Sequence, residues 1–279
     1  MLDRSVDNYA VVGNPIAQSK SPLIHSAFAE ATSQSLSYER IEAPLGQFAQ
    51  TVDAFRKAGG RGINITAPFK LDAFAYATER SERAQQAGAA NALKFEGDRV
   101  ITENFDGIGL VRDLVHNLAC PINGKRVLIV GAGGATRGAL APLLGESPAK
   151  LVVANRTVQT ALDVIAPYAA FSGVSACGLN DLGAESFDVV LNASSAGLNG
   201  QQTAISANVF AANSFAYDLT YGKGLTSFLQ LAKAAGVTRL ADGVGMLAEQ
   251  AAEAFLWWRG VRPDTRAVIE RLTVPLVVR

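Results

Sequence analysis

Short apolar runs and amphipathic segments alternate along the whole chain. Brief β-branched runs bounded by glycine, proline or polar residues predict buried strands, and apolar residues three or four positions apart predict helices. The expected strands are 9–12, 37–43, 62–67, 126–130, 150–155, 187–193 and 214–219, with a hairpin over 92–102. The expected helices are 21–31, 45–57, 106–118, 135–144, 157–168, 225–235 and a long one ending near 259. This alternation predicts the α/β class with parallel sheets.

Residues 121–124, Pro-Ile-Asn-Gly, predict a linker between two halves of the chain. With 279 residues, 49% of them hydrophobic, the chain is long enough for two domains with separate cores. We expect a first domain over 1–105 with 241–279 packing back on it, and a second domain over 106–240 inserted between these parts. A cleft between the domains is the expected place for chemistry.

Charge and hydropathy exclude several classes of protein. Lys plus Arg and Asp plus Glu number 25 each, and no basic patch interleaved with aromatic residues indicates nucleic acid. The start lacks a signal-peptide core, and Glu249 and Glu253 interrupt the apolar stretch near the end, which excludes a membrane span. Cys120 and Cys177 stand alone without metal or redox spacing. We expect a soluble, cytoplasmic, metal-free monomer or homodimer with two buried, reduced thiols.

Residues 125–138 read KRVLIVGAGGATRG, a strand followed by a glycine turn and the start of a helix. Gly131, Gly133 and Gly134 let the backbone turn tightly and let phosphate oxygens approach without a Cβ in the way. The helix start adds free N–H groups and a positive dipole end. The spacing departs from G-x-G-x-x-G because position 136 is Thr and the next glycine is Gly138. The turn predicts a pyrophosphate site.

The next expected strand ends in Asn155-Arg156-Thr157, where a dinucleotide fold meets the adenosine ribose. A site selective for NAD usually carries Asp or Glu there, and this chain has neither. Arg156 offers a fixed cation and Thr157 a hydroxyl to a 2′-phosphate. We therefore expect NADP rather than NAD, against the alternative that Arg156 is a solvated surface residue.

Four polar clusters lie at expected strand ends or helix starts, which is the ligand-binding edge of an open α/β sheet. Ser19-Lys20-Ser21 suits a carboxylate, with the alternative that Ser21 is only the N-cap of a helix whose first residue is Pro22. The others are the segment 64–70, which reads NITAPFK, then Asn91, and then the segment 104–107, which reads NFDG, where N-capping is the alternative for its aspartate.

Lys70 and Asp106 are the expected acid–base pair. Hydride transfer between a carbinol and a nicotinamide needs a group that takes or gives the hydroxyl proton. His25 lies inside the first helix and His116 late in another, so neither is well placed. Lys70 held against Asp106 is therefore the remaining acid–base candidate.

The chain as a whole resembles the shikimate dehydrogenases. The motifs that carry the resemblance occur in the family's order: YAVVGNPIAQSKSPLIH, NITAPFK, GAANAL, NFDGIG, GAGGATRG, NRT, NASSAG and DGVGMLAEQAAEAF. The resemblance implies a discontinuous α/β substrate domain with an inserted Rossmann-type NADP domain. It also implies reversible reduction of 3-dehydroshikimate to shikimate in aromatic amino-acid biosynthesis.

The resemblance also implies roles for individual residues. Lys70 and Asp106 would be catalytic, and Ser19 and Ser21 would bind the substrate carboxylate. Thr66, Asn91 and Gln250 would hold ring hydroxyls, and Tyr221 would line the site. The implied cofactor residues are Gly131, Ala132, Gly133, Gly134, Ala135, Asn155, Arg156 and Thr157, with Gly243 and Met246 near the nicotinamide.

The chain departs from the family pattern at three places. Phe105 stands where the family has a threonine, so we expect it at the pocket wall or beside Asp106, lowering activity on shikimate; the alternative is that it points into the core. Position 160 is Thr where a second arginine is frequent, which weakens the grip on a 2′-phosphate. No proline precedes the helix after Tyr221.

Two other functions stay open. One is a dehydrogenase for quinate or another hydroxylated ring acid, linked to NADP or NAD. The other is a non-catalytic NADP-binding regulator, which the joint presence of Lys70, Asp106, Asn91 and Gln250 argues against.

Overall fold

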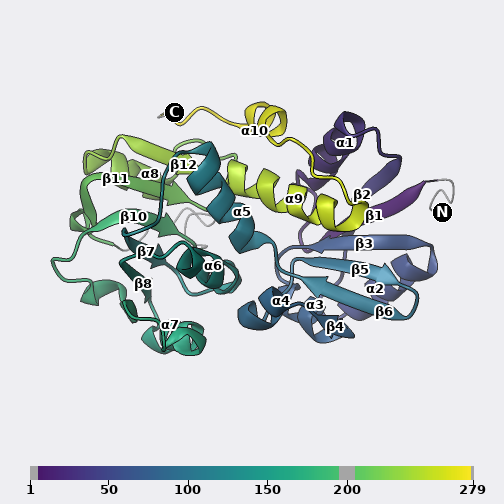
Figure 1. The fold of residues 1–279 in the computed structure, drawn as a ribbon, viewed down its shortest axis with the longest axis horizontal. Helices are drawn as coiled ribbons and strands as arrows, with labels where there is room; N and C mark the ends of the chain where they lie inside the picture. Colours follow the sequence, from purple (N-terminus) through teal and green to yellow (C-terminus); the bar gives the residue numbers. More distant parts are fainter. Residues whose placement is uncertain (1–5, 195–204, 278–279) are drawn as a thin grey trace. The chain divides into compact units, whose positions relative to one another are not determined.

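The computed structural model describes residues 6–194 and 205–277, which form two compact units (Figure 1). Unit 1 comprises Met1–Gly109 and Ala248–Val268, and unit 2 comprises Leu110–Leu247 and Ile269–Arg279. The first unit is therefore discontinuous in sequence. Its boundaries lie four and seven residues after the expected 105 and 240, and the last eleven residues, expected in the first domain, fall in unit 2.

The sheet of unit 1 has the strand order β2-β1-β3-β5-β6-β4. Its strands are β1 (Asp7–Gly13), β2 (Leu36–Glu42), β3 (Gly60–Ile65), β4 (Glu79–Arg80), β5 (Ala92–Glu96) and β6 (Arg99–Glu103). The β1–β2, β1–β3 and β4–β6 pairs are parallel, whereas β5 is antiparallel to both β3 and β6. The expectation of a parallel sheet is thus wrong for this unit, because the hairpin over 92–102, which was predicted, places an antiparallel pair in the sheet.

Helices cover both faces of this sheet. They are α1 (Ser21–Ala31), α2 (Phe48–Lys57), α3 (Lys70–Tyr76), α4 (Glu82–Ala87), the start of α5 (Asp106–Arg112) and the part of α9 (Val244–Arg259) from Ala248 onward. Successive residues of a strand point to opposite faces. In β1, Ala10 and Val12 pack with Val52 and Phe55 of α2, while Tyr9 faces Trp258 of α9.

Unit 2 contains an all-parallel sheet with the order β12-β11-β10-β7-β8-β9. Its strands are β7 (Arg126–Val130), β8 (Lys150–Asn155), β9 (Val174–Gly178), β10 (Phe187–Asn192), β11 (Phe210–Asp218) and β12 (Arg239–Asp242). Counted along the chain this is the doubly wound order 3-2-1-4-5-6 read from the other edge. The order reverses between β7 and β10, which is the point where such sheets bind ligands.

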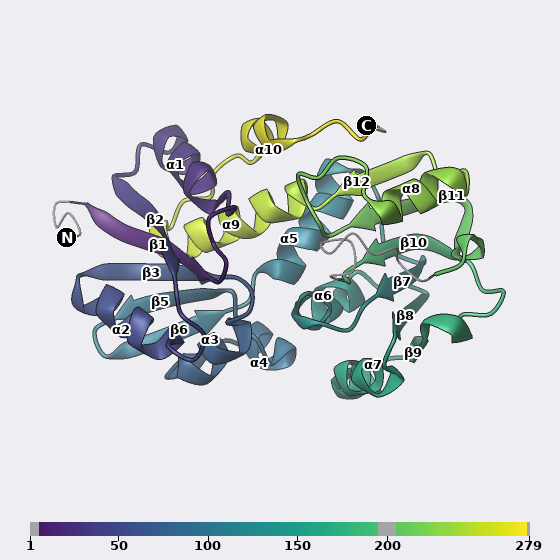
Figure 2. The same ribbon diagram turned by 180° about the vertical axis from the view of Figure 1, so that it is seen from behind.

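Helices cover both faces of the second sheet (Figure 2), and residues on both faces are buried, as a parallel sheet requires. One face packs on α6 (Gly134–Gly145), α7 (Val158–Ile165) and the π-helical segment Asp113–Asn117, and the other on α8 (Ser227–Ala234). Every residue of β7 except Arg126 is buried. That double burial explains why this strand reads as one continuous apolar run.

Most expected strands and helices are confirmed to within a few residues, and β7 has the predicted bounds. Several short elements were missed, namely β4, β9, α3, α4 and α10 (Arg266–Leu272). Ser21 is not the N-cap of α1: Lys20 occupies that position and Ser21 is the first helical residue. In the described residues, no helix has the length and apolar character that crossing a membrane requires.

Candidate active site

Lys70 and Asp106 form an ion pair in unit 1. Lys70 opens α3 just after β3, and Asp106 opens α5 just after β6. Both therefore lie past the carboxyl ends of two strands that run in the same direction on either side of β5. Lys70 Nζ lies 2.5 Å from Asp106 Oδ2, and the two side chains are 23% and 8% exposed. This is the pair that the sequence predicted. A lysine held this way can present its Nζ to a substrate hydroxyl.

Asn91 and Gln250 complete the same cluster. The Asn91 amide donates to Asp106 Oδ1 at 2.8 Å and to Gln250 Oε1 at 3.2 Å. The carboxylate of Asp106 therefore has one oxygen on Lys70 and the other on Asn91. Residues 159 positions apart in sequence meet here. The sequence named all four, and the structure brings them together.

Ser19 and Ser21 lie side by side at the start of α1. The Ser19 hydroxyl donates to Ser21 Oγ at 3.2 Å, and both residues are buried. Ser19 Oγ also accepts from the Ser21 backbone N–H at 3.3 Å. Arg40 of β2 donates two hydrogen bonds to the Ser19 carbonyl, at 2.6 and 2.9 Å. The two hydroxyls are thus fixed by the backbone around them.

Tyr38 and His25 adjoin this pair, and sequence reasoning missed their arrangement. The Tyr38 hydroxyl donates to Asn64 Oδ1 at 2.7 Å. The His25 ring stacks on Tyr38 with centroids 4.2 Å apart. Burial raises the pKa of Tyr38 well above its usual value and lowers the pKa of His25 to about 3. His25 is therefore neutral at physiological pH and acts as a packing residue. No local pattern marks a stack between a helix and a strand.

Thr66 follows β3 and contacts the last two residues of β1. A Cβ on Gly13 would lie 2.5 Å from Thr66 Cγ2, so only glycine leaves room for that side chain. The Thr66 backbone N–H donates to the Val12 carbonyl at 2.9 Å. Thr66 itself is half-buried.

Phe105 does not lie in the polar cluster. Its side chain is 3% exposed and packs with Ala92 and Ala254 in a small apolar core. Its ring meets Trp257 edge to face at 5.7 Å between centroids. The expectation that Phe105 forms the pocket wall is wrong, because aromatic packing draws the ring away from the polar side chains around Asp106.

In unit 2 the glycine turn has the geometry that the sequence predicted. Gly131 has φ +106°, and a Cβ there would lie 2.9 Å from the Ser194 backbone nitrogen. Gly133 has open space instead, with nothing within 4 Å of an added Cβ. Helix α6 starts at Gly134 with neither a side-chain cap nor an acidic residue in its first turn. Gly131 therefore permits the turn, and Gly133 leaves access to an uncapped helix start.

The remaining residues of this turn and of the next strand end differ in their exposure. Ala132 is buried, and Ala135 is half-buried in the first turn of α6. Asn155 donates from its amide to the Thr157 carbonyl at 2.9 Å. Arg156 and Thr157 are exposed. Within the described parts of the chain, Arg156 makes no ion pair, so its guanidinium can bind an anion.

Tyr221, Gly243 and Met246 lie around the end of β12. A Cβ on Gly243 would lie 2.3 Å from the Leu219 carbonyl oxygen, and the Gly243 N–H donates to the Thr220 carbonyl at 3.2 Å. Burial raises the pKa of Tyr221. The Met246 N–H donates to the buried Tyr217 hydroxyl at 3.3 Å. These three residues are thus close to one turn of unit 2.

Asn192 and Asp218 form a buried polar group that the sequence reasoning did not single out. Asp218 accepts from the Asn192 amide at 3.1 Å and from the Thr226 hydroxyl at 2.6 Å. Burial raises the pKa of Asp218. Asn192 opens the expected motif NASSAG, of which positions 195–197 lie outside the described residues. The sequence signal that could have identified this pair is a polar residue at the end of each of two apolar strands, Asn192 of β10 and Asp218 of β11.

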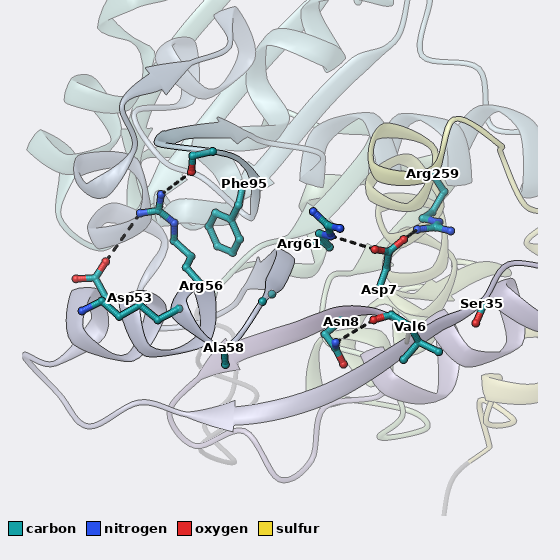
Figure 3. Close-up of a pocket in the computed structure, with 14 residues that line it drawn as sticks. Val6, Asp7, Asn8, Ser35, Asp53, Arg56, Ala58, Arg61, Phe95 and Arg259 are labelled. Atoms are coloured by element: carbon teal, nitrogen blue, oxygen red, sulfur yellow. Dashed lines mark hydrogen bonds and ion pairs between the residues drawn. The ribbon is translucent and has the colours of Figure 1, made fainter. Parts of the chain in front are cut away.

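A cavity of about 800 Å³ lies elsewhere in unit 1 (Figure 3). It is lined at the starts of β1 and β3, the ends opposite to Thr66 and Lys70. Its arginines are already engaged: Arg61 and Arg259 pair with Asp7, and Arg56 pairs with Asp53. None of the expected site residues lines it.

Known proteins match the chain over nearly its whole length. Residues 11–93 match the shikimate dehydrogenase substrate binding domain, 113–209 the shikimate/quinate 5-dehydrogenase domain, and 243–273 the shikimate 5'-dehydrogenase C-terminal domain. Shikimate dehydrogenase (NADP(+)) from Nitrosospira multiformis is 52% identical over 95% of this chain and 97% of that protein. The chain therefore belongs to the shikimate dehydrogenase family.

Solved structures agree. The crystal structure of an Ael1 enzyme from Pseudomonas putida has a TM-score of 0.93 and 56% identity, covering 97% of this chain and all of that one. Shikimate 5-dehydrogenase from Thermus thermophilus, in complex with NADP(H) and shikimate, has a TM-score of 0.85 and 32% identity, covering 95% and 97%. The expected fold, a discontinuous substrate domain with a Rossmann-type domain, is confirmed.

Proposed function

We propose that this chain is an NADP-dependent dehydrogenase that interconverts 3-dehydroshikimate and shikimate. The observation that carries the proposal is the ion pair of Lys70 with Asp106, extended through Asn91 to Gln250. A regulator that only senses NADP would need no such proton-transfer pair. Relatives about half identical to the chain are named shikimate dehydrogenase (NADP(+)), which supports the same activity.

The residues of unit 1 fit a hydroxylated ring acid. Ser19 and Ser21 offer two adjacent hydroxyls beside a helix start, which suit a carboxylate. Thr66, Asn91 and Gln250 offer a hydroxyl and two amides to ring hydroxyls. A site that hydrogen-bonds substrate hydroxyls rejects analogues lacking them, because its buried polar groups would be left unpaired.

Lys70 handles the proton of the reacting oxygen. During reduction its ammonium gives a proton to the oxygen of the ketone, which becomes the hydroxyl of shikimate. During oxidation the neutral amine takes that proton back. Asp106 accepts a hydrogen bond from Nζ in the first state and keeps the side chain in place, so the proton moves at a fixed position.

The residues of unit 2 fit NADP. Gly131, Gly133 and the uncapped start of α6 form a cradle in which a pyrophosphate finds free N–H groups. Exposed Arg156 and Thr157 suit the 2′-phosphate, and Asn155 the ribose. NADP supplies the hydride acceptor, or donor, for the reaction. Gly243 and Met246 are proposed to lie near its nicotinamide.

The other expectations from the sequence stay predictions. These are a cytoplasmic location, the absence of a metal and of nucleic-acid partners, and a monomer or homodimer. Tyr221 as a residue that lines the substrate site is likewise a proposal.

Initial rates with shikimate and quinate, each with NADP⁺ and NAD⁺, test the function. We expect shikimate with NADP⁺ to give the largest kcat/KM. A larger value with quinate would contradict the substrate assignment, and a larger value with NAD⁺ the cofactor assignment. Absence of turnover in all four reactions would favour the regulator.

A further inference from the structure

The bend between β6 and α5 is held by side chains rather than by regular backbone pairing. Three consecutive backbone N–H groups each donate to a side-chain oxygen. Asn104 donates to Glu103 Oε1 at 2.8 Å, Phe105 to Asn91 Oδ1 at 2.9 Å, and Asp106 to Asn104 Oδ1 at 3.1 Å. The direction in which the Asp106 carboxylate points therefore depends on these acceptors.

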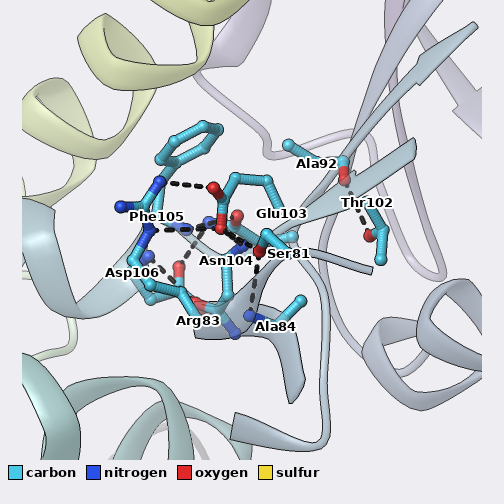
Figure 4. Close-up of polar contacts among 10 residues, drawn as sticks. Ser81, Arg83, Ala84, Ala92, Thr102, Glu103, Asn104, Phe105 and Asp106 are labelled. Carbon is cyan, nitrogen blue, oxygen red and sulfur yellow. Dashed lines mark hydrogen bonds and ion pairs between the residues drawn. The ribbon is translucent and has the colours of Figure 1, made fainter. Parts of the chain in front are cut away.

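Glu103 is the one of these acceptors that lies outside the polar clusters expected from the sequence. Its side chain is 7% exposed, and a buried carboxylate is costly unless it is paired and hydrogen-bonded. The pairing is extensive (Figure 4): the Ser81 hydroxyl donates at 2.6 Å, and Arg83 donates through Nε at 3.2 Å and also through Nη2. With the Asn104 N–H, both carboxylate oxygens are used.

Arg83 also reaches the residue after Asn104. Its guanidinium lies over the Phe105 ring, 5.7 Å from the centroid, while that ring meets Trp257 on an edge. Arg83 therefore contacts Glu103 before the bend and Phe105 within it. Its side chain is 43% exposed, so it can be replaced without leaving a buried cavity.

Asn104 transmits this arrangement to Asp106. Its backbone N–H is held by Glu103, its amide donates to the Ala89 carbonyl at 3.0 Å, and its Oδ1 holds the Asp106 N–H. If Glu103 is lost, Asn104 loses one of its three anchors. Displacement of a catalytic group by about 1 Å can lower the rate by roughly 100-fold.

We propose that Glu103, paired with Arg83, is a positioning residue for Asp106, a role that rests on the proposed function of the Lys70–Asp106 pair. Glu103 fixes the bend and touches neither substrate nor cofactor. Its loss therefore acts on the chemical step, through Asp106, and leaves substrate binding by Ser19 and Ser21 in place.

Steady-state kinetics of Glu103→Ala with shikimate and NADP⁺ test this role. We expect kcat to fall roughly 10- to 100-fold while KM for shikimate changes by less than about threefold. Glu103→Gln keeps an oxygen that can accept from the Asn104 N–H, so we expect it to recover at least about fivefold of the lost kcat. A Glu103→Gln variant no faster than Glu103→Ala would overturn the proposal.

Arg83→Met is a second variant for the same kinetic measurement if Glu103→Ala does not fold, since it removes the partner of Glu103 at a partly exposed position. We expect its kcat to fall by roughly fivefold or more at nearly constant KM. Unchanged kcat, or a raised KM with kcat unchanged, would overturn the proposal.

Asp188→Ala is a matched control in unit 2. Asp188 accepts from the Arg126 backbone N–H at 2.8 Å and from its guanidinium, at the starts of β7 and β10 rather than at the glycine turn. The Asp188→Ala variant, like Glu103→Ala, loses a carboxylate that accepts from a backbone N–H and from an arginine. Its kcat should stay within about twofold of wild type.

Amide hydrogen exchange separates this proposal from the proposed function, because it needs no turnover. Exchange at residues 104–106 should be faster in Glu103→Ala than in wild type, and equal exchange would overturn the positioning role. A wild-type protein without shikimate-dependent NADP⁺ reduction would instead refute the proposed function.

Discussion

The two candidate ligand-binding regions differ in how many of their polar groups already have hydrogen-bond partners within the protein. In unit 1, Asp106 has both carboxylate oxygens hydrogen-bonded and its N–H held by Asn104. In unit 2, the first turn of α6 has no side-chain cap, and Arg156 is exposed without an ion-pair partner among the described residues. The proposed proton-transfer groups are thus positioned in advance, whereas the proposed cofactor region leaves its N–H groups and Arg156 open to the phosphates of a cofactor. Proton transfer needs catalytic groups held at fixed positions, and anion binding needs N–H groups that have no other acceptor.

Lys70→Ala is expected to have the largest effect. Removing the group that transfers the proton should lower kcat by roughly 10²- to 10⁴-fold, with KM for shikimate changed much less. Steady-state kinetics measure both constants. Lys57→Ala, at the exposed end of α2, is the control and should leave kcat unchanged. A raised KM with normal kcat would mean that Lys70 only binds substrate.

Phe105→Thr should act on stability rather than on specificity. Removing a buried ring costs about 3–5 kcal/mol of unfolding free energy, and the threonine hydroxyl gains no obvious partner beside Trp257. Denaturant unfolding measures the loss, and Phe105→Leu should lose less. In the folded fraction, kcat/KM for shikimate should not rise. A rise would restore the interpretation that Phe105 restricts the substrate site.

Phe105 also illustrates what the sequence could predict. The glycine turn and β7 could be predicted because each depends on a few adjacent residues. The turn depends most on Gly131, whose positive φ favours glycine. The direction of Phe105 depends on Trp257, which lies far along the chain, and the stack of His25 on Tyr38 depends on how α1 meets β2. Such contacts leave no local periodicity.

Short elements escaped prediction for a related reason. Helices α3 and α4 have seven and six residues, too few for a clear amphipathic pattern, and they are stabilised by tertiary packing. The N-cap of α1 was predicted one residue too late: the Ser19 hydroxyl accepts the Ser21 N–H, and the helix already begins at Ser21 with Lys20 as its N-cap. The candidate site residues could be proposed from the sequence because most of them follow predicted strand ends.

Arg156→Ala should weaken NADP⁺ binding by about 1.5–3 kcal/mol, because a charge-assisted hydrogen bond to the 2′-phosphate is lost. NAD⁺, which lacks that phosphate, should bind as before. Titration calorimetry with both cofactors measures the difference. Arg266→Ala, whose side chain is 86% exposed and paired with Asp264, is the control. Equal losses for the two cofactors would show that Arg156 does not contact the phosphate.

The two histidines offer a smaller, pH-dependent contrast. Burial lowers the pKa of His25 from 6.5 to about 3, so between these values the unfolded chain binds a proton that the folded protein does not. The free energy of unfolding should therefore fall as pH drops through this window, by up to about 1.4 kcal/mol per pH unit. Unfolding of His25→Phe at several pH values should show a shallower slope. His116→Phe, at an exposed position, keeps His25 in place and serves as the control variant.

Amide hydrogen exchange of the wild-type protein, with and without NADP⁺, tests the contrast between the two regions most directly. The amides of residues 104–106 should exchange slowly in both states, since side-chain oxygens already accept their hydrogen bonds. The amides of residues 133–136, at the start of α6, should exchange quickly without NADP⁺ and slowly with it. Rapid exchange at 104–106 in the ligand-free protein, or no protection at 133–136 by NADP⁺, would contradict the account.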